Sequence, residues 1–353
     1  MENRKADLNN RNLNIDLARC LACLGVVGLH GIGMIDYTLY YFCSFSVPMF
    51  FMINGYLMFR KDRVDYAYSL KKALSYIRII ILWNIVLAIT LKVIKHKFVN
   101  PLTESVRNIF QKGYLWHFWY FGAMLLTLLL LPLVHTVLKK NLKIHIASTA
   151  VLFICSLLVT LSSMRAEYPN QAFVPQFLRV WVFGFYFLFG GLMGVRSLKD
   201  KEAADDKEAS DDKETSSDKK GKADIKVIIL SVAFVLLTYI ANTSQKHLGN
   251  FSYHNRIADN FYDEGTVMIW CAVFFMLLLS IKVVIPEKIV TGFGKLSLGI
   301  FILHPLFLKA AEILNLPDTT AMALVRWALA VAVCAIASFV MLKIPYIKKM
   351  IEL

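Results

Sequence analysis

The sequence predicts an all-α protein, a bundle of about ten helices that cross a membrane. Apolar residues make up 57% of the 353 residues, and the mean hydropathy is positive. Runs of about 20 apolar residues, the length that a helix needs to cross a bilayer, recur from end to end. Lys and Arg gather between these runs, as is typical of helical membrane proteins.

The formal net charge of +14 follows from this placement of basic residues beside the apolar runs. It therefore does not indicate nucleic-acid binding, and we expect no nucleic-acid partner. The first apolar run lacks a small-x-small cleavage pattern and is followed at once by another run, so we expect no cleaved signal peptide. We expect a multi-pass protein of the plasma membrane, surrounded by lipid, with both termini in the cytoplasm.

Ten apolar segments are expected to span the membrane: 14–34, 40–59, 73–94, 114–138, 144–162, 177–194, 226–242, 263–284, 293–313 and 321–342. The polar segment before them, Met1 to Leu13, is expected to stay in the cytoplasm. One loop departs from the rule that basic residues face the cytoplasm. A misplaced span, or a re-entrant segment near Asn100 and Pro101, would explain why its basic residues face outward: Lys92, Lys95, Lys97, Arg107 and Lys112.

Residues 197–224 differ in character from the rest of the chain. They repeat the triplet Asp-Lys-Glu every six residues and contain almost nothing that can be buried. We predict a solvated, low-complexity cytoplasmic linker, partly helical at most, between the sixth and seventh spans. The whole chain, 1–353, is otherwise expected to form one membrane domain.

The first span carries three polar residues that a simple anchor does not need: Asp16, Arg19 and His30. At about 100° and about 1.5 Å per residue, Arg19 and His30 share one helix face and lie roughly 16 Å apart. Asp16 precedes Arg19 by three residues and can pair with it. One interpretation is a buried ion pair and a structural histidine. The other is a catalytic base, because histidine titrates near pH 6.5, about neutrality, with Arg19 as its charged anchor.

Three further places carry polar groups. Asn54 can donate a hydrogen bond to an oxyanion, while Gly55 beside it also suits a helix-packing notch. The aromatic stretch around His117 suits either an interfacial belt or a wall that stacks on sugar rings. His304 is expected at about the depth of His30, as a structural or as a functional residue.

Taken in order, these motifs resemble acyltransferase family 3, the integral membrane O-acyltransferases that decorate bacterial surface polysaccharides. The resemblance rests on R-x10-H (Arg19, His30) after Ile15-Asp16, on Val47-Pro48 with Phe50-Phe51 and Gly55-Tyr56, on Trp116-His117-Phe118-Trp119 with Pro132, and on Leu296-Ser297 to His304-Pro305. The chain departs from the family pattern at three positions. Asn54 replaces a commoner Ser, Phe301 replaces a common Tyr, and Ser75 holds the first position of R-x-x-R, which leaves only Arg78.

The resemblance implies an O-acyltransferase that uses an acyl-coenzyme A donor, most often acetyl-coenzyme A. The implied acceptor is a hydroxyl of a cell-envelope polysaccharide or of its lipid-linked precursor. No metal and no permanently bound cofactor are expected. Basic residues near the cytoplasmic face are predicted to hold the phosphates of coenzyme A: Arg60, Lys61, Lys71, Lys72 and Arg78. Arg19 is expected to sit deeper and to hold the pyrophosphate or the pantetheine.

Under this hypothesis His30 deprotonates the sugar hydroxyl, and Asn54 or His304 stabilises the oxyanion. A covalent acyl-histidine is an open variant. Trp116, His117 and Trp119 are predicted to bind the sugar. The alternative function is a transporter or flippase for a lipid-linked sugar or polysaccharide, in which the same polar residues line a path.

Overall fold

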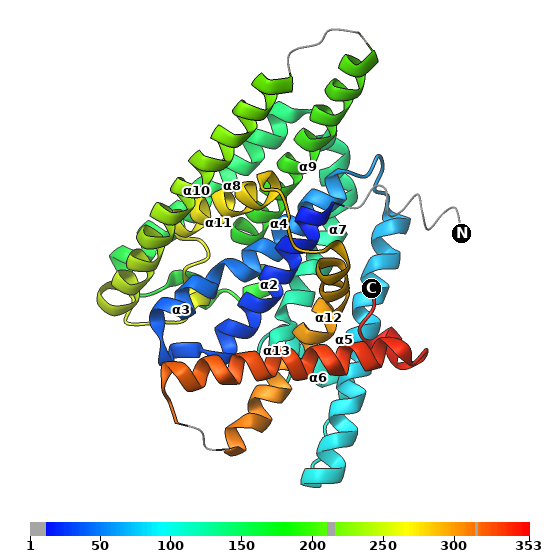
Figure 1. Ribbon diagram of the computed structural model, residues 1–353. Helices are drawn as coiled ribbons and strands as arrows, with labels where there is room; N and C mark the ends of the chain where they lie inside the picture. The colour runs from blue at the N-terminus through cyan, green and yellow to red at the C-terminus, as the bar shows by residue number, and fades with distance from the viewer. Residues whose placement is uncertain (1–11, 210–215, 315–316) are drawn as a thin grey trace.

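The computed structural model describes residues 12–209, 216–314 and 317–353, and within these ranges it contains helices and loops but no strand. Figure 1 shows a bundle of long helices, several of them strongly tilted against one another. Most of the expected cytoplasmic segment before the first span (residues 1–11) and the middle of the predicted linker (residues 210–215) lie outside the described residues.

Nine helical segments in the described ranges are long and apolar enough to cross a membrane. They are α2 (Leu13–Gly31), α3 (Tyr37–Phe42) with α4 (Ser46–Phe59), α5 (Tyr66–Lys95), a turn at Trp116–Phe118 with α7 (Trp119–Lys140), α8 (Leu142–Ala166), α9 (Val180–Ala209), α10 (Ser216–His247), α12 (Glu287–Ala311) and α13 (Thr320–Lys343). A tenth apolar helix, α11 (Gly265–Ser280), has 16 residues. The predicted all-α membrane bundle of about ten helices is therefore confirmed.

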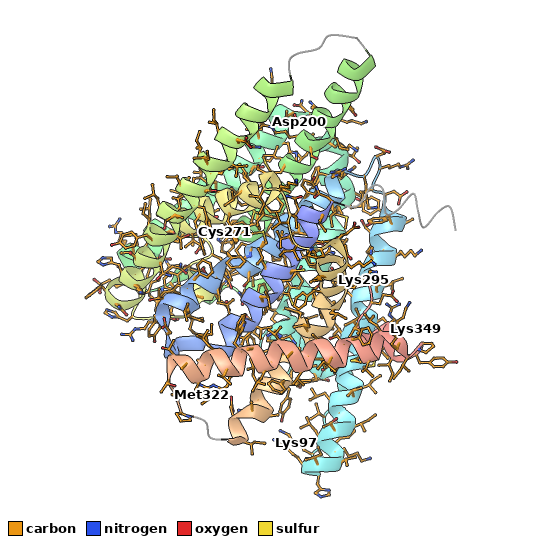
Figure 2. All side chains as sticks on the ribbon, viewed as in Figure 1. Lys97, Asp200, Cys271, Lys295, Met322 and Lys349 are labelled. Atoms are coloured by element: carbon orange, nitrogen blue, oxygen red, sulfur yellow. The ribbon has the colours of Figure 1, made fainter. Side chains whose placement is uncertain are left out.

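Hydrogen bonds between helix ends mark the two ends of the bundle. At the end that holds the α9–α10 connection, the Asn12 amide donates to Tyr56 Oη (3.0 Å), and Tyr56 Oη donates to Ser197 Oγ (3.0 Å). At the other end, Thr320 Oγ1 donates to the Asp36 carboxylate (3.3 Å). We call these the linker end and the opposite end. In Figure 2, Asp200 marks the first and Lys97 the second.

Short polar side chains begin many of the helices. Each accepts a hydrogen bond from a backbone N–H of the first turn, which would otherwise lack a partner. These caps are Asn12 of α2, Asp36 of α3, Asp65 of α5, Asn100 of α6 (Pro101–Ile109), Asn141 of α8, Glu264 of α11 and Thr319 of α13. The caps explain why these helices begin at these polar residues.

Two features differ from expectation. Helix covers residues 197–209 and 216–224 of the predicted linker, because Ala, Glu and Lys are strong helix formers that extend the stable membrane helices α9 and α10. After α5, the chain forms the short helix α6 (Pro101–Ile109) rather than an additional span. The basic residues of this loop therefore do face the opposite end, beside α6.

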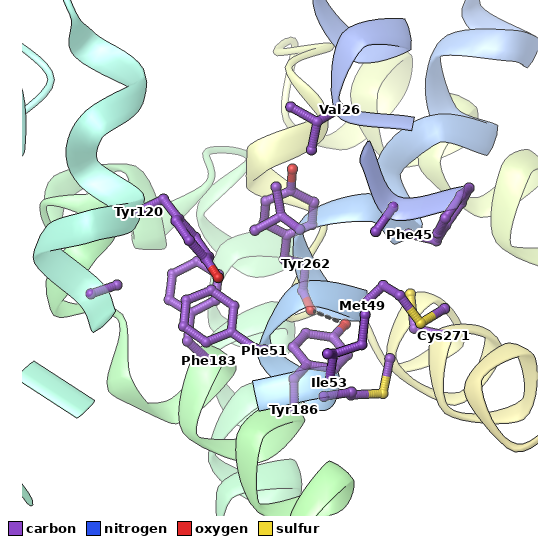
Figure 3. Close-up of a cluster of buried hydrophobic side chains, with 14 of the residues drawn as sticks. Val26, Phe45, Met49, Phe51, Ile53, Tyr120, Phe183, Tyr186, Tyr262 and Cys271 are labelled. Carbon is purple, nitrogen blue, oxygen red and sulfur yellow. Dashed lines mark hydrogen bonds between the residues drawn. The ribbon is translucent and has the colours of Figure 1, made fainter. Parts of the chain in front are cut away.

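The core of the bundle depends on close contact between α4 and α9. An added Cβ at Gly55 would overlap the carbonyl oxygen of Phe187, and one at Gly190 would overlap that of Met52. This contact confirms the helix-packing interpretation of Gly55. Around it, buried aromatic side chains stack, among them Phe51 and Phe183, whose ring centroids lie 4.6 Å apart (Figure 3).

Candidate active site

Three histidines and a tryptophan meet near the opposite end of the bundle. The His30 and His304 rings are stacked with centroids 5.2 Å apart, and the rings of His30 and Trp116 are nearly perpendicular with centroids 4.9 Å apart. The His117 ring centroid lies 5.9 Å from that of His304. We call these four residues the histidine cluster. The expectation that His30 and His304 lie at the same depth is confirmed.

Three separate elements bring the histidine cluster together. His30 lies in the last turn of α2, His304 lies in the middle of α12, and Trp116 and His117 form the 3₁₀ turn that leads into α7. Helix α2 packs directly against α12. His30 and His304 therefore meet across one helix interface, while the turn before α7 adds the other two rings.

Hydrogen bonding determines the tautomer of His304. Its Nδ1 lies 3.1 Å from the carbonyl oxygen of Ile300. Because a carbonyl oxygen only accepts, Nδ1 carries the hydrogen, and Nε2 of the neutral ring is left as an acceptor. Nε2 is buried and has no hydrogen-bond partner in the part of the chain that the structure describes. A buried polar atom without a partner is uncommon in proteins and often marks a functional site.

The three histidines differ in exposure. His117 and His304 are buried, at 2% and 0% exposure. His30 is only partly buried. His30 is therefore the histidine of the cluster that a molecule can reach most readily.

A second feature is a cavity of about 660 Å³ that lies toward the linker end. Four basic residues line it, and we call it the basic cavity: Arg19, Lys72, Lys295 and Lys348. Glu352 is an acidic residue in the same lining. The predicted pair of Arg19 with Asp16 is confirmed, because Arg19 Nη1 lies 3.0 Å from the Asp16 carboxylate.

The ring of Phe301 separates the basic cavity from the histidine cluster. Phe301 lines the cavity, and its centroid lies 5.5 Å from that of His117 and 6.1 Å from that of His304. Tyr120, which also lines the cavity, packs against Phe301 with 5.4 Å between the ring centroids. One aromatic side chain, Phe301, therefore contacts both the cavity and the histidine cluster. We call the cavity and the cluster the two compartments of the site.

Asn54 lines the basic cavity near this partition. Its amide nitrogen donates to the carbonyl oxygen of Phe50 (2.8 Å) and to Tyr120 Oη (3.1 Å). Both amide hydrogens are thus engaged within the protein. To donate to an oxyanion, Asn54 would have to release one of these two partners.

Other predicted site residues lie outside these two compartments. Lys71 is exposed on α5 and does not line the basic cavity. Arg78 lies behind the cavity wall, where its Nη2 donates to the backbone oxygen of Glu352 (2.7 Å). Arg60, at the end of α4, donates to Tyr56 Oη of the same helix (2.8 Å) and to Ser197 Oγ of α9 (3.2 Å).

Trp119 also lies away from the histidine cluster. It is 4% exposed, and its ring centroid lies 5.2 Å from that of Phe183 on α9. Of the three residues predicted to bind sugar, Trp116 and His117 belong to the cluster and Trp119 belongs to the core.

Two basic residues of the cavity were missed by sequence reasoning. Lys295 lies just before the Leu296-Ser297 motif, and the spacing of Gly294, Leu298 and Phe301 places one face of α12 on the cavity. That spacing could have been used to predict that this part of α12 lines the cavity. Lys348 belongs to a short turn after α13 that folds back onto α5, where Trp83 Nε1 donates to the Met350 carbonyl oxygen (2.9 Å). No local pattern predicts that contact.

The fold and the two compartments define a multi-pass membrane protein with a polar site built inside its bundle. A family model described as an acyltransferase domain matches residues 12–343. The chain therefore belongs to acyltransferase family 3.

Part of the chain is also similar to a serine/alanine racemase of Enterococcus gallinarum, with 32% identity over 148 residues. The matched segment is 37% of this chain and covers 21% of the racemase, about a fifth of its length. No solved structure matches the chain.

Proposed function

We propose that the protein transfers an acyl group, in the first instance acetyl, from acyl-coenzyme A to a hydroxyl of a carbohydrate. The observation that carries the proposal is the arrangement of a basic cavity and a histidine cluster on the two sides of one side chain, Phe301. The cavity suits a large anionic donor, and the cluster suits proton transfer.

The donor site is the basic cavity. Coenzyme A carries several phosphate groups, and Arg19, Lys72, Lys295 and Lys348 give the cavity a surplus of positive charge. This assignment places the linker end, the basic cavity and both termini in the cytoplasm, where acyl-coenzyme A is found. The histidine cluster then lies toward the outer face, from which the carbohydrate approaches His30.

The chemical step needs a base and a path for the acyl group. His30 takes the proton of the acceptor hydroxyl, and the hydroxyl oxygen attacks the thioester carbon. A carbon–oxygen bond forms, the carbon–sulfur bond breaks, and the leaving thiolate takes up the proton that His30 accepted. Phe301 must rotate away from the cluster for the thioester to reach His30.

The oxyanion formed in this step needs a hydrogen-bond donor, and the two candidates are His304 and Asn54. His304 donates through Nε2 only when its ring is protonated, because Nδ1 already donates to Ile300. Asn54 donates only after it releases Tyr120 or Phe50. Each of the two therefore has to change its hydrogen bonding or protonation when substrate binds. The acyl-histidine variant would form the same ester through an intermediate on His30.

The test is release of free thiol from acetyl-coenzyme A by the purified protein in detergent. We expect release that depends on an added polysaccharide extract, together with acetyl groups that appear on the polysaccharide. Folded protein that releases no thiol under these conditions would contradict the donor and would favour a transporter or flippase. Release without acceptor, accompanied by an acetylated histidine peptide, would favour the acyl-histidine variant.

A pair of neighbouring lysines tests the donor site. Lys72 lines the basic cavity and Lys71 does not. Lys72→Gln is expected to raise KM for acetyl-coenzyme A about fivefold to tenfold with little change in kcat, since it removes one charge-assisted contact to phosphate. Lys71→Gln, which changes the net charge equally, is expected to leave KM unchanged. Equal effects of the two variants would contradict this position for the donor.

A further inference from the structure

A second cavity, of about 460 Å³, lies at the opposite end of the bundle. It is formed by the connection after α5, by α6 and by the turn before the histidine cluster, and we call it the α6 pocket. Its charged lining residues are Lys97, Glu104, Arg107 and Lys112. Nothing in the chemistry proposed above uses these residues.

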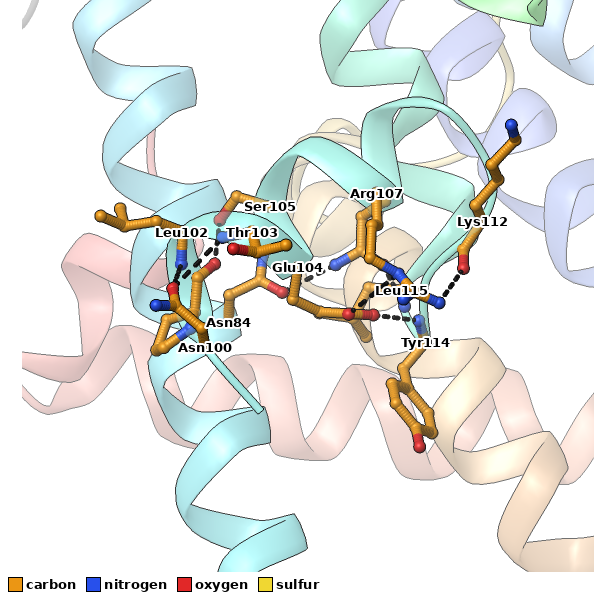
Figure 4. A network of polar contacts seen from close by, with 12 residues as sticks. Asn84, Asn100, Leu102, Thr103, Glu104, Ser105, Arg107, Lys112, Tyr114 and Leu115 are labelled. Carbon is orange, nitrogen blue, oxygen red and sulfur yellow. Dashed lines mark hydrogen bonds and ion pairs between the residues drawn. The ribbon is translucent and has the colours of Figure 1, made fainter. Parts of the chain in front are cut away.

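A buried network of hydrogen bonds holds residues that line the α6 pocket in place (Figure 4). The Asn108 amide donates to Asn84 Oδ1 (2.7 Å), and the backbone N–H of Leu115 donates to Asn108 Oδ1 (2.8 Å). The Glu104 carboxylate accepts from the backbone N–H of Tyr114 (2.8 Å). Asn84 and Asn108 are 0% exposed and Glu104 is 3% exposed. A network this well satisfied holds its loop in one conformation.

The same network links the pocket to the histidine cluster. Gly113 packs so closely on it that an added Cβ would overlap both Glu104 Oε1 and Asn108 Oδ1. Only two residues separate Gly113 from Trp116, which touches His30. The wall of the pocket and one wall of the cluster are therefore consecutive parts of one rigid turn.

The pocket is positively charged on balance. The Glu104 carboxylate is engaged by Arg107, whose Nε lies 3.4 Å away, and by the backbone N–H of Tyr114. The charges of Lys97 and Lys112 have no acidic partner within ion-pair distance among the described residues. Both lysines line the pocket, so their charges are left to attract an anion to it.

Two exposed aromatic rings lie beside these cations. Phe98 is 78% exposed and Tyr114 is 42% exposed. Lys97 Nζ donates to Tyr114 Oη (3.0 Å) and lies 5.5 Å from the ring centroid. A sugar ring has apolar C–H faces that stack on such rings, while its acidic groups pair with the ammonium groups.

The sequence offers a separate reason to assign a role to these cations. Basic residues of polytopic proteins gather on the cytoplasmic side, yet Lys97, Arg107 and Lys112 lie at the opposite end. A role in binding explains why basic residues stand at this end.

We propose that the α6 pocket is the site where the acceptor is held, and that the acceptor is an acidic glycan that carries phosphate or carboxylate groups. The inference rests on the proposed function, because it gives the acceptor of that reaction its chemical class. The anionic group pairs with Lys97 and Lys112, a neighbouring sugar stacks on Tyr114 or Phe98, and a hydroxyl further along reaches His30.

An anionic lipid headgroup offers the same phosphate chemistry. Two features of the pocket surface favour a glycan over a lipid headgroup. The two exposed rings provide stacking faces, and the supporting turn leads directly to the histidine cluster. A headgroup site needs neither feature.

The experiment measures binding by equilibrium dialysis, with the full chain in nanodiscs of neutral phosphatidylcholine and no acyl-coenzyme A. The probes are radiolabelled trigalacturonate and maltotriose, which match in length and differ in charge. Wild type is expected to bind trigalacturonate at least about tenfold more tightly than maltotriose, and added salt is expected to reduce the difference. Equal binding of the two probes would overturn the proposal.

Matched lysine pairs locate the site. The double variant Lys97→Gln/Lys112→Gln is expected to lose the preference for trigalacturonate. The double variant Lys92→Gln/Lys95→Gln removes the same charge from exposed positions outside the pocket and is expected to keep it. Loss in both variants would overturn the proposal, because it would show a diffuse charge effect.

A further measurement repeats the dialysis in nanodiscs of phosphatidylglycerol, an anionic lipid, instead of phosphatidylcholine. Unchanged binding of trigalacturonate supports a glycan site, whereas its loss would assign the pocket to lipid headgroups and overturn the proposal. The design also separates this inference from the proposed function. If the protein prefers trigalacturonate but releases no thiol, the proposed acyl transfer is contradicted and the glycan site is not. If it releases thiol with neutral acceptors only, the glycan site is contradicted and acyl transfer is not.

Discussion

Replacing His30 with glutamine is expected to lower kcat for acyl transfer by about 10²- to 10⁴-fold, the usual range for loss of a general base. Glutamine is similar in size to histidine and can still hydrogen-bond, but it cannot accept the proton of the acceptor hydroxyl. The stacked ring of His304 and the edge of Trp116 surround the site of this change. KM for acetyl-coenzyme A is expected to change little, because the basic cavity lies on the other side of Phe301.

The measurement is acceptor-dependent thiol release, with protein amount and folding checked by size-exclusion chromatography and thermal unfolding. His247→Gln is the matched control, because His247 is exposed at the end of α10 and lies outside both compartments. His247→Gln should retain wild-type activity. Normal activity of a folded His30→Gln protein would remove His30 from the chemistry, for the direct and the acyl-histidine mechanism alike.

The second large effect is expected on stability, at the contact between α4 and α9. Gly55→Ala adds one methyl group where the carbonyl oxygen of Phe187 already lies, so the two helices must separate. Overpacking of a tight core costs about 1–3 kcal/mol, and a clash with backbone belongs at or above the top of this range. We expect a loss of several degrees in the apparent unfolding temperature and a lower yield of monodisperse protein.

Gly292→Ala is the matched control for this change. Gly292 lies inside helix α12, and no atom lies within 4 Å of an added Cβ. Because alanine favours helix over glycine by roughly 1 kcal/mol, this variant should be as stable as wild type or more stable. If Gly55→Ala unfolded at the same temperature as Gly292→Ala, the close α4–α9 contact would be wrong.

Much of the fold follows from local pattern. Apolar runs predict the spans, and single capping residues predict many of their starts. The pattern of residues 197–224 predicts too little helix, because low apolar content indicates a solvated linker although Ala, Glu and Lys favour helix. At α6 the sequence indicates only a misplaced span or a re-entrant segment near Asn100 and Pro101. No apolar stripe marks the helix, because its inward side is held by Glu104 and Asn108.

The candidate site was predictable where it depends on helix geometry. The Arg19–Asp16 pair follows from spacing, and the meeting of His30 with His304 follows from equal depth in two spans. Contacts that depend on how distant segments fold back were not predictable. Lys348 reaches the basic cavity through a turn after α13, and Trp119 faces α9 although its neighbours in sequence face the histidines.

The partition formed by Phe301 has a consequence for the cell as well as for the reaction. A passage lined by lysines on one side and histidines on the other would conduct protons if water filled it continuously. The Phe301 ring is 8% exposed and packs against Tyr120 and Phe121, at 5.4 and 5.5 Å between centroids. Under the proposed function, this ring opens once for each acyl group transferred, and its closed position between turnovers would limit proton leakage.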